Sequence, residues 1–138
     1  MAPNDHTPAA LSILYVEDDP DARRIASLLV SRKFPDFAIL KAENGQVGLE
    51  LFREHRPEIV ITDINMPVMD GIRMAKEIRA IDPNARIIAV TAHSDQSYLR
   101  DAESAGITHY LLKPMDRKKL YEVIEACIAD IAAQRQKP

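Results

Sequence analysis

The chain has 138 residues, 46% of them hydrophobic and 28% charged, which predicts one globular domain that buries a core. Its net charge of −3, from 18 basic and 21 acidic residues, argues against direct nucleic-acid binding, because such surfaces usually need a basic face. The single cysteine excludes an intrachain disulfide and indicates a reducing, cytoplasmic compartment, and no run approaches the roughly 18 apolar residues of a membrane span.

Residues 1–10 lack the basic start and the apolar stretch of a signal peptide. They contain two prolines and several small or polar residues, which predicts a disordered leader. The folded domain is expected to span residues 11–133, and a polar tail or the start of a linker residues 134–138. The chain is then either free-standing or, as its long last helix favours, a piece of a larger protein.

Five short apolar runs follow in chain order, and each is a predicted strand. The runs cover Ser12–Val16, Ala38–Ala42, 59–62, Arg86–Thr91 and His109–Leu112. Three of them are nearly uninterrupted rather than alternating, which indicates strands buried on both faces, as in parallel sheets.

Amphipathic helical patterns lie between and after these runs. Their apolar faces consist of Ala22, Ile25, Ala26 and Leu29; of Val47, Leu51 and Phe52; of Ile72, Ala75 and Ile78; of Leu99, Ala102 and Ala105; and of Leu120, Val123, Ile124, Cys127 and Ile131. Pro20 suits a helix start and Gly106 a helix end. Five strand–helix units predict a doubly wound α/β sheet with helices on both faces.

Ligands of such sheets bind beyond the carboxyl ends of the strands, where polar residues of matching chemistry gather in this chain. These residues are Glu17, Asp18, Asp63, Thr91 and Lys113. Converging carboxylates repel and need a cation, and an all-oxygen set suits Mg²⁺, which shares its shell with a phosphate. Thr91 could donate a hydrogen bond to a phosphoryl oxygen, Lys113 could neutralise its charge, and Asp63 could form an acyl phosphate.

Over residues 12–131 the chain resembles a response-regulator receiver domain of two-component signalling. The resemblance rests on the segments ILYVEDD, TDINMPVMDG, IIAVTAH and YLLKP, which are specific together and weak alone. It implies a five-stranded parallel sheet of flavodoxin-like order 2-1-3-4-5. It also implies a signalling switch rather than an enzyme, one that promotes only its own phosphorylation and autodephosphorylation.

The resemblance implies a phosphoacceptor and a metal site. Asp63 would accept a phosphoryl group from a histidine kinase or a histidine phosphotransfer protein. Mg²⁺, for which Mn²⁺ could substitute, would bind Asp18, Asp63 and the backbone carbonyl of Asn65 directly. Glu17 would act largely through a metal-bound water molecule.

Other residues of the resemblance concern the phosphoryl group and the switch. Thr91 and Lys113 would hold the phosphoryl oxygens, and the bond from Lys113 to Pro114 would be cis. Tyr110 would be an aromatic switch that turns inward when Thr91 moves. His93 would border the phosphoryl group and tune its lifetime, unless it is simply an exposed loop residue.

The family commonly binds partners or dimerises through the surface formed by the fourth helix, the fifth strand and the fifth helix. Here that surface would include Tyr98, Leu99, Tyr110, Asp116 and Tyr121. The expected partners are a kinase or phosphotransfer protein and an output domain or protein, with no direct contact to nucleic acid or membrane. The domain would be a monomer or a phosphorylation-dependent dimer.

Two alternative functions compete with this switch. Phosphatases with an aspartyl nucleophile often carry a second Asp two positions later, and Asn65 at that position cannot exchange a proton. A phosphorylation-independent interaction module has usually lost an acid, the Thr or the Lys, and none of these is missing. Three smaller expectations remain: Asp19 points away from the metal, Gly48 costs about 1 kcal/mol of helix propensity, and Cys127 is a buried thiol.

Overall fold

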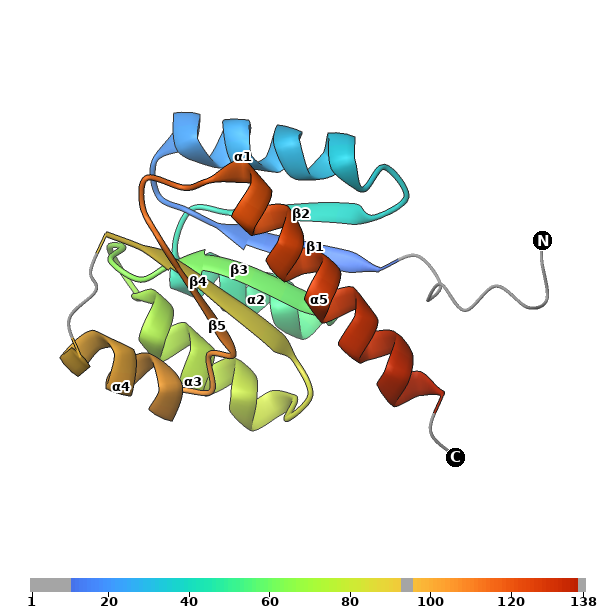
Figure 1. Ribbon diagram of the computed structural model, residues 1–138. Coiled ribbons are helices and arrows are strands. Elements are labelled where there is room, and N and C mark those ends of the chain that lie inside the picture. The colour runs from blue at the N-terminus through green and yellow to red at the C-terminus, as the bar shows by residue number, and fades with distance from the viewer. Residues whose placement is uncertain (1–10, 93–95, 137–138) are drawn as a thin grey trace.

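The computed structural model describes residues 11–92 and 96–136, so the expected leader and His93 lie outside the described residues. Within them, five strands alternate with five helices (Figure 1). The strands are β1 (Ser12–Val16), β2 (Ala38–Ala42), β3 (Ile59–Asp63), β4 (Arg86–Thr91) and β5 (His109–Leu112). The helices are α1 (Pro20–Lys33), α2 (Gly45–His55), α3 (Gly71–Ile81), α4 (Gln96–Ser104) and α5 (Arg117–Arg135). Every predicted run is a strand, and β3 extends one residue further, to Asp63.

The strands form one parallel sheet in the order β2-β1-β3-β4-β5, which confirms the predicted topology. The register aligns the carboxyl ends of the central strands. Val16 of β1 lies opposite Thr62 of β3, and Asp63 lies opposite Val90 of β4. The residues that follow β1 and β3 therefore reach the same edge of the sheet at the same level.

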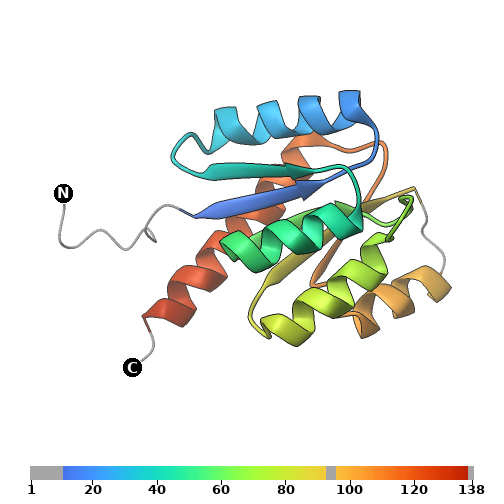
Figure 2. The ribbon, with the colours of Figure 1, turned by 180° about the vertical axis from the view of Figure 1, so that it is seen from behind.

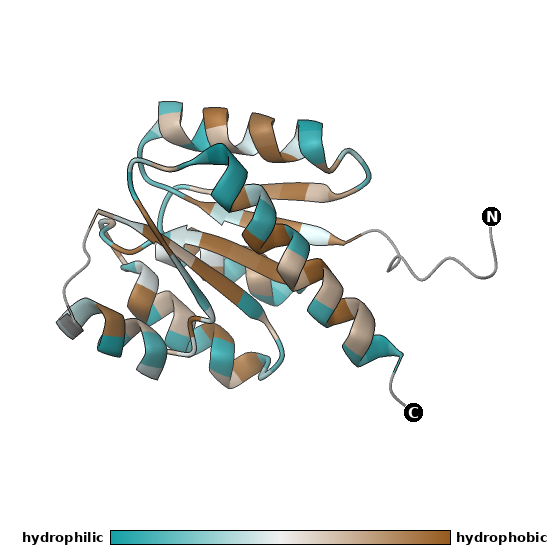
Figure 3. Ribbon diagram, in the orientation of Figure 1, coloured by the Kyte–Doolittle hydropathy of each residue, from teal (hydrophilic) through white to brown (hydrophobic). Residues whose placement is uncertain are grey.

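Helices cover both faces of the sheet (Figure 2). Each face has its own apolar core. α1 and α5 cover one face, with Ala26, Val30, Leu120, Ile124, Cys127 and Ile131 against Ile13, Ile59, Ile61 and Ile88. α2, α3 and α4 cover the other, with Leu49, Phe52, Met74, Ile78, Ala102 and Ala105 against Leu14, Val16, Val60 and Ile87. The central strands are brown in Figure 3 because their side chains are apolar toward both layers, as their continuous runs predicted.

Two predicted helix faces differ from the observed ones. In α1 the buried residues are Ala26, Ser27 and Val30, while Ile25 is 51% exposed. The prediction for Ile25 was wrong because the apolar residues of this helix cover a wide arc, so periodicity does not fix which part of that arc meets the sheet. In α4 the small Ala102 packs inward and Leu99 stays 38% exposed.

Glycines allow two close approaches near the carboxyl edge. A Cβ on Gly48 of α2 would lie 2.7 Å from Met74 Sδ and 3.1 Å from Val16 Cγ2, so a side chain there would overlap β1 and α3. A Cβ on Gly71, the first residue of α3, would overlap the backbone oxygen of Asp63. Gly71 N also donates a 2.8 Å hydrogen bond to the carbonyl of Ile64. Glycine at position 48 therefore lowers the helix propensity of α2 but allows the helix to pack closely against β1 and α3.

The longest helix, α5, continues to Arg135, two residues beyond the predicted domain boundary. Its last turn is bound at the amino ends of β3 and β4. Arg135 Nη2 lies 3.1 Å from Glu58 Oε2, and Gln134 accepts a 3.0 Å hydrogen bond from Arg86. Among the described residues, no helix is both long and apolar enough to cross a membrane.

Candidate functional site

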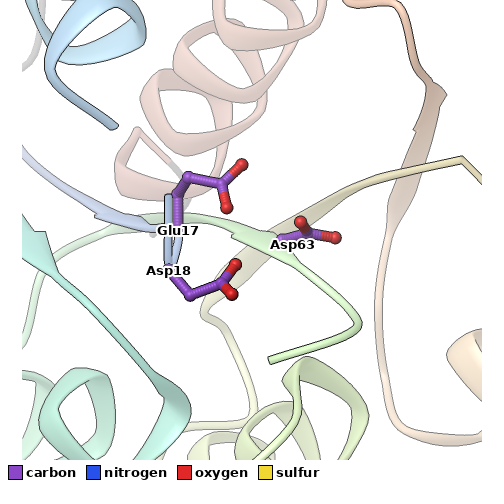
Figure 4. Close-up of side chains that lie close together, drawn as sticks. All are labelled: Glu17, Asp18 and Asp63. Atoms are coloured by element: carbon purple, nitrogen blue, oxygen red, sulfur yellow. The ribbon is translucent and has the colours of Figure 1, made fainter. Parts of the chain in front are cut away.

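Three carboxylates meet beyond the carboxyl ends of β1 and β3. Glu17, Asp18 and Asp63 each offer a ligand oxygen, and these three atoms lie within 4.8 Å of one another. Figure 4 shows Glu17 and Asp18 on the turn after β1 and Asp63 at the end of β3, with their carboxylates around one space. The convergence predicted from the strand ends is therefore observed.

Lys113 supplies the positive charge of the site. It follows β5, and its Nζ lies 2.8 Å from Asp63 Oδ2 and 3.3 Å from Glu17 Oε1. The other oxygen of Asp63, Oδ1, accepts a 2.7 Å hydrogen bond from the N–H of Ile64. The Asp63 carboxylate is thus oriented by a backbone donor on one oxygen and an ammonium on the other. The bond between Lys113 and Pro114 is cis, as predicted.

Burial and charge act together on this cluster. Burial raises the pKa of Glu17, which is 5% exposed, and the neighbouring Asp18 and Asp63 raise it further, whereas the Asp19 N–H and Lys113 oppose the shift. Burial lowers the pKa of Lys113, but its bonds and attraction to Asp63 and Glu17 outweigh burial, so the net shift is upward. The cluster therefore carries more negative charge than its ammonium balances.

A divalent cation fits this donor set. The three side chains offer only oxygen ligands, which suit a hard cation such as Mg²⁺. With three carboxylates against one ammonium, the site has an uncompensated charge of about −2 when all its groups are ionised. Burial is the main cause of the raised pKa of Glu17, and the neighbouring Asp18 and Asp63 add to it; a bound cation would offset that part of the shift.

The remaining predicted residues lie around this cluster. Thr91 ends β4 and is 1% exposed, one residue beyond the position that pairs with Asp63. Asn65 is exposed on the loop after β3. Tyr110 of β5 is partly buried and packs, like Tyr98, against the core under α2, α3 and α4.

One residue of the predicted output surface lies elsewhere. Tyr121 of α5 faces α1, where its hydroxyl donates a 3.1 Å bond to the carbonyl of Leu29 and its ring packs edge-on to Phe34. Lys33 Nζ lies 5.7 Å from the centre of the Tyr121 ring. The prediction that Tyr121 belongs to the surface of α4, β5 and α5 was therefore wrong, because Tyr121 lies on the side of α5 that faces α1.

Sequence reasoning missed three residues that shape the site. Asp19 is the N-cap of α1 and accepts a bond from Ala22 N at 3.3 Å, which gives a structural role to an acid predicted only to point away from the metal. Arg23 of α1 donates to the carbonyl of Glu17 at 2.7 Å. Tyr15 of β1 is buried below the cluster, and burial, followed by the charges of Glu17 and Asp63, raises its pKa. The capping pattern Asp-Pro could have revealed Asp19.

The comparisons with known proteins agree with the fold and the site. Residues 13–125 match the family model of the response regulator receiver domain. The chain is 41% identical over 113 residues to the chemotaxis protein CheY of Bacillus subtilis, covering 81% of this chain and 92% of that protein.

Solved structures give the same result. The N-terminal domain of an uncharacterized protein from Wolinella succinogenes has a TM-score of 0.83 and 36% identity, covering 91% of this chain and 99% of that one. A chain of the CheX–CheY–BeF₃–Mg²⁺ complex of Borrelia burgdorferi has a TM-score of 0.78 and 27% identity, covering 84% of this chain and 87% of that one. The family match, the sequence identity and the shared topology together show that this chain belongs to the response regulator receiver domain family.

Proposed function

We propose that the chain is a phosphorylation-controlled switch in which Asp63 accepts a phosphoryl group from a histidine kinase or a histidine phosphotransfer protein. The observation that carries this proposal is the Asp63 carboxylate, which sits among two further carboxylates and 2.8 Å from the Lys113 ammonium. Receiver domains are signalling proteins that bind Mg²⁺ and interact with histidine kinases and output domains. The site of this chain contains the groups that such a transfer needs.

The transfer forms one bond to phosphorus and breaks another. An Asp63 oxygen attacks the phosphorus of a phosphohistidine, the P–N bond breaks, and the imidazole leaves with its electron pair. The Ile64 N–H holds Oδ1, so Oδ2 is the oxygen free to bond to phosphorus once Lys113 moves from it. Lys113 and the Thr91 hydroxyl then hold the phosphoryl oxygens. Positioning and charge neutralisation are most of what phosphoryl transfer requires.

Mg²⁺ supplies charge neutralisation at this site when it is bound. Asp18 and Asp63 would bind it through carboxylate oxygens, Asn65 through its backbone carbonyl, and Glu17 through water. Mn²⁺ could substitute, because it accepts the same oxygen donors. The domain promotes only its own phosphorylation and dephosphorylation, and a cytoplasmic location remains a prediction from its cysteine content.

The output would be a change at the surface of α4, β5 and α5. Thr91 is buried at the end of β4, so its movement toward a phosphoryl group would alter the packing beside Tyr110. An open depression of about 430 Å³ borders this region, and Leu99, Glu103, His109 and Tyr110 are among its lining residues. The proposed partner is an output domain or protein, with the chain a monomer or a phosphorylation-dependent dimer.

Intact-protein mass after incubation with a small phosphodonor tests the proposal. The parent protein should gain one phosphoryl group in the presence of Mg²⁺ and much less in EDTA. Asp63→Asn should fold and gain none, whereas Asp36→Asn, which changes an exposed acid in the turn between α1 and β2, should behave as the parent. An adduct on folded Asp63→Asn would show that Asp63 is not the acceptor.

A further inference from the structure

Arg23 connects the first turn of α1 to the turn that carries two of the site's carboxylates. Its Nη1 donates a 2.7 Å hydrogen bond to the carbonyl oxygen of Glu17, and its side chain is half-buried. Its own backbone N–H donates a 2.9 Å helical bond to the carbonyl of Asp19. Arg23 is therefore hydrogen-bonded to residues 17–19 at two points, through its guanidinium and through its backbone N–H.

The backbone of Glu17 is held from both sides. Its N–H donates a 3.0 Å bond to Ala42 of β2, and its carbonyl accepts the bond from Arg23. The Glu17 side chain also accepts a 3.2 Å bond from Asp19 N. Asp18 lies between these fixed points, so Arg23 helps to fix the backbone from which its exposed carboxylate extends.

This restraint opposes a real repulsion. Glu17, Asp18 and Asp19 are three consecutive acids, and the first two face a third carboxylate on Asp63. Among the described residues, the ion pairs of the cluster are those of Lys113 with Glu17 and Asp63. Arg23 instead donates a hydrogen bond to the backbone carbonyl of Glu17. An unrestrained turn would separate the carboxylates, because like charges within 4.8 Å repel.

We propose that Arg23 is a positioning residue for the divalent-cation site, which it pre-organises by holding the peptide after Glu17. This inference rests on the proposed Mg²⁺ site. It makes a prediction with an unusual sign: the Arg23 charge alone repels Mg²⁺, so removing Arg23 would strengthen binding if charge were its main effect. Positioning predicts the reverse, a weaker Mg²⁺ site after its removal.

Arg24 provides a matched control. It is the next residue of α1 and carries the same charge. Among the described residues its one ion pair is with Asp21, at 3.7 Å, and both side chains are exposed. Mg²⁺ titration at fixed ionic strength, followed by amide chemical shifts, should show about tenfold weaker binding for Arg23→Ala. Arg24→Ala should bind as tightly as the parent or slightly more tightly. Arg23→Lys should recover part of the loss, and this rescue separates positioning from charge because Lys restores the repelling charge.

A second measurement needs no metal. In EDTA, hydrogen exchange at the amides of residues 17–19 should be faster in Arg23→Ala than in the parent and unchanged in Arg24→Ala. The proposal fails if Arg23→Ala binds Mg²⁺ as tightly as the parent, if both Ala variants change alike, or if Lys gives no rescue. Should Arg23→Ala not fold, Arg23→Gln replaces it in the same comparison.

The test separates this inference from the proposed function. If Asp63 gains no phosphoryl group while Arg23→Ala still weakens Mg²⁺ binding, the phosphoacceptor assignment fails and the positioning role stands. If Asp63 is phosphorylated normally and Mg²⁺ affinity is insensitive to Arg23, the positioning role fails alone.

Discussion

Replacing Glu17 by Gln should stabilise the metal-free protein. At an effective dielectric constant of about 20, a like charge at the 4.8 Å limit of separation costs about 3.5 kcal/mol, and an opposite charge at 3.3 Å contributes about 5 kcal/mol. Two repulsions from Asp18 and Asp63 against one attraction to Lys113 leave a net repulsion of about 2 kcal/mol on Glu17. Solvent screening around the exposed Asp18 and Lys113 reduces this to a gain of about 1 kcal/mol for Glu17→Gln, which keeps an acceptor for Asp19 N–H.

Urea unfolding in EDTA at pH 7 measures this gain, with Glu125→Gln on the exposed face of α5 as the control. The pH dependence has a definite sign. The folded-state pKa of Glu17 is raised, so its stabilising contribution is complete below the unfolded pKa and is lost as pH rises through the folded value. The variant's advantage over the parent should therefore shrink as pH falls from neutral. A metal-free Glu17→Gln protein less stable than the parent at pH 7 would refute the electrostatic reasoning.

Mg²⁺ should reduce the advantage of Glu17→Gln over the parent. A cation that binds only the folded state stabilises by RT ln(1 + [L]/Kd), about 1.4 kcal/mol at ten times Kd. Because Gln carries no charge, the variant should gain less than the parent at the same Mg²⁺ concentration. Equal gains would show that Glu17 does not contribute to the cation site.

Two further predictions concern the packing around the site. Gly48→Ala should lower the free energy of unfolding by about 1–3 kcal/mol although Ala is the better helix former, because its Cβ would overlap Met74 and Val16; equal or greater stability in urea would contradict this packing. Burial raises the pKa of Cys127 to about 11, so the thiol is neutral at pH 8 as well as buried. A thiol reagent at pH 8 should therefore modify Cys127 no faster than the folded protein unfolds locally to expose it. The contribution of this neutral thiol to stability should be lost as pH rises through about 11, and rapid modification at pH 8 without unfolding would show that the thiol is accessible.

The strands and the acidic cluster could be predicted because each has a strong physical cause. Continuous apolar runs form strands buried by helices on both sides, and the parallel register brings Glu17 and Asp63 to one level. The orientation of α1 could not be predicted in the same way. Ile25 and Leu28 are both exposed there, while the polar Ser27 is buried, so tertiary packing overrides the local pattern.

Contacts to backbone atoms account for most of what the sequence concealed. Arg23 binds the Glu17 carbonyl, Tyr121 binds the Leu29 carbonyl, and neither acceptor has a residue type that marks it. Tyr110 of β5 and Tyr121 of α5 are aromatic residues in consecutive elements. Of these two, Tyr110 packs on the side of the sheet that α4 covers, and Tyr121 packs against α1. A motif names the charged partners of a site, and the fold alone reveals which carbonyls restrain them.

The site itself opposes the stability of the domain. Its three carboxylates stay within 4.8 Å although, in the part of the chain that the structure describes, Lys113 alone supplies an ammonium to them, and burial adds to the cost at Glu17. Two apolar cores, one on each face of the sheet, offset that cost and hold the strand ends in register. Because the repulsion exists before any ligand binds, a cation at this site, or the loss of one of its charges, would relieve it. The Asp63→Asn and Glu17→Gln variants should therefore both reduce the repulsion within the metal-free site, although only the former removes the proposed phosphoacceptor.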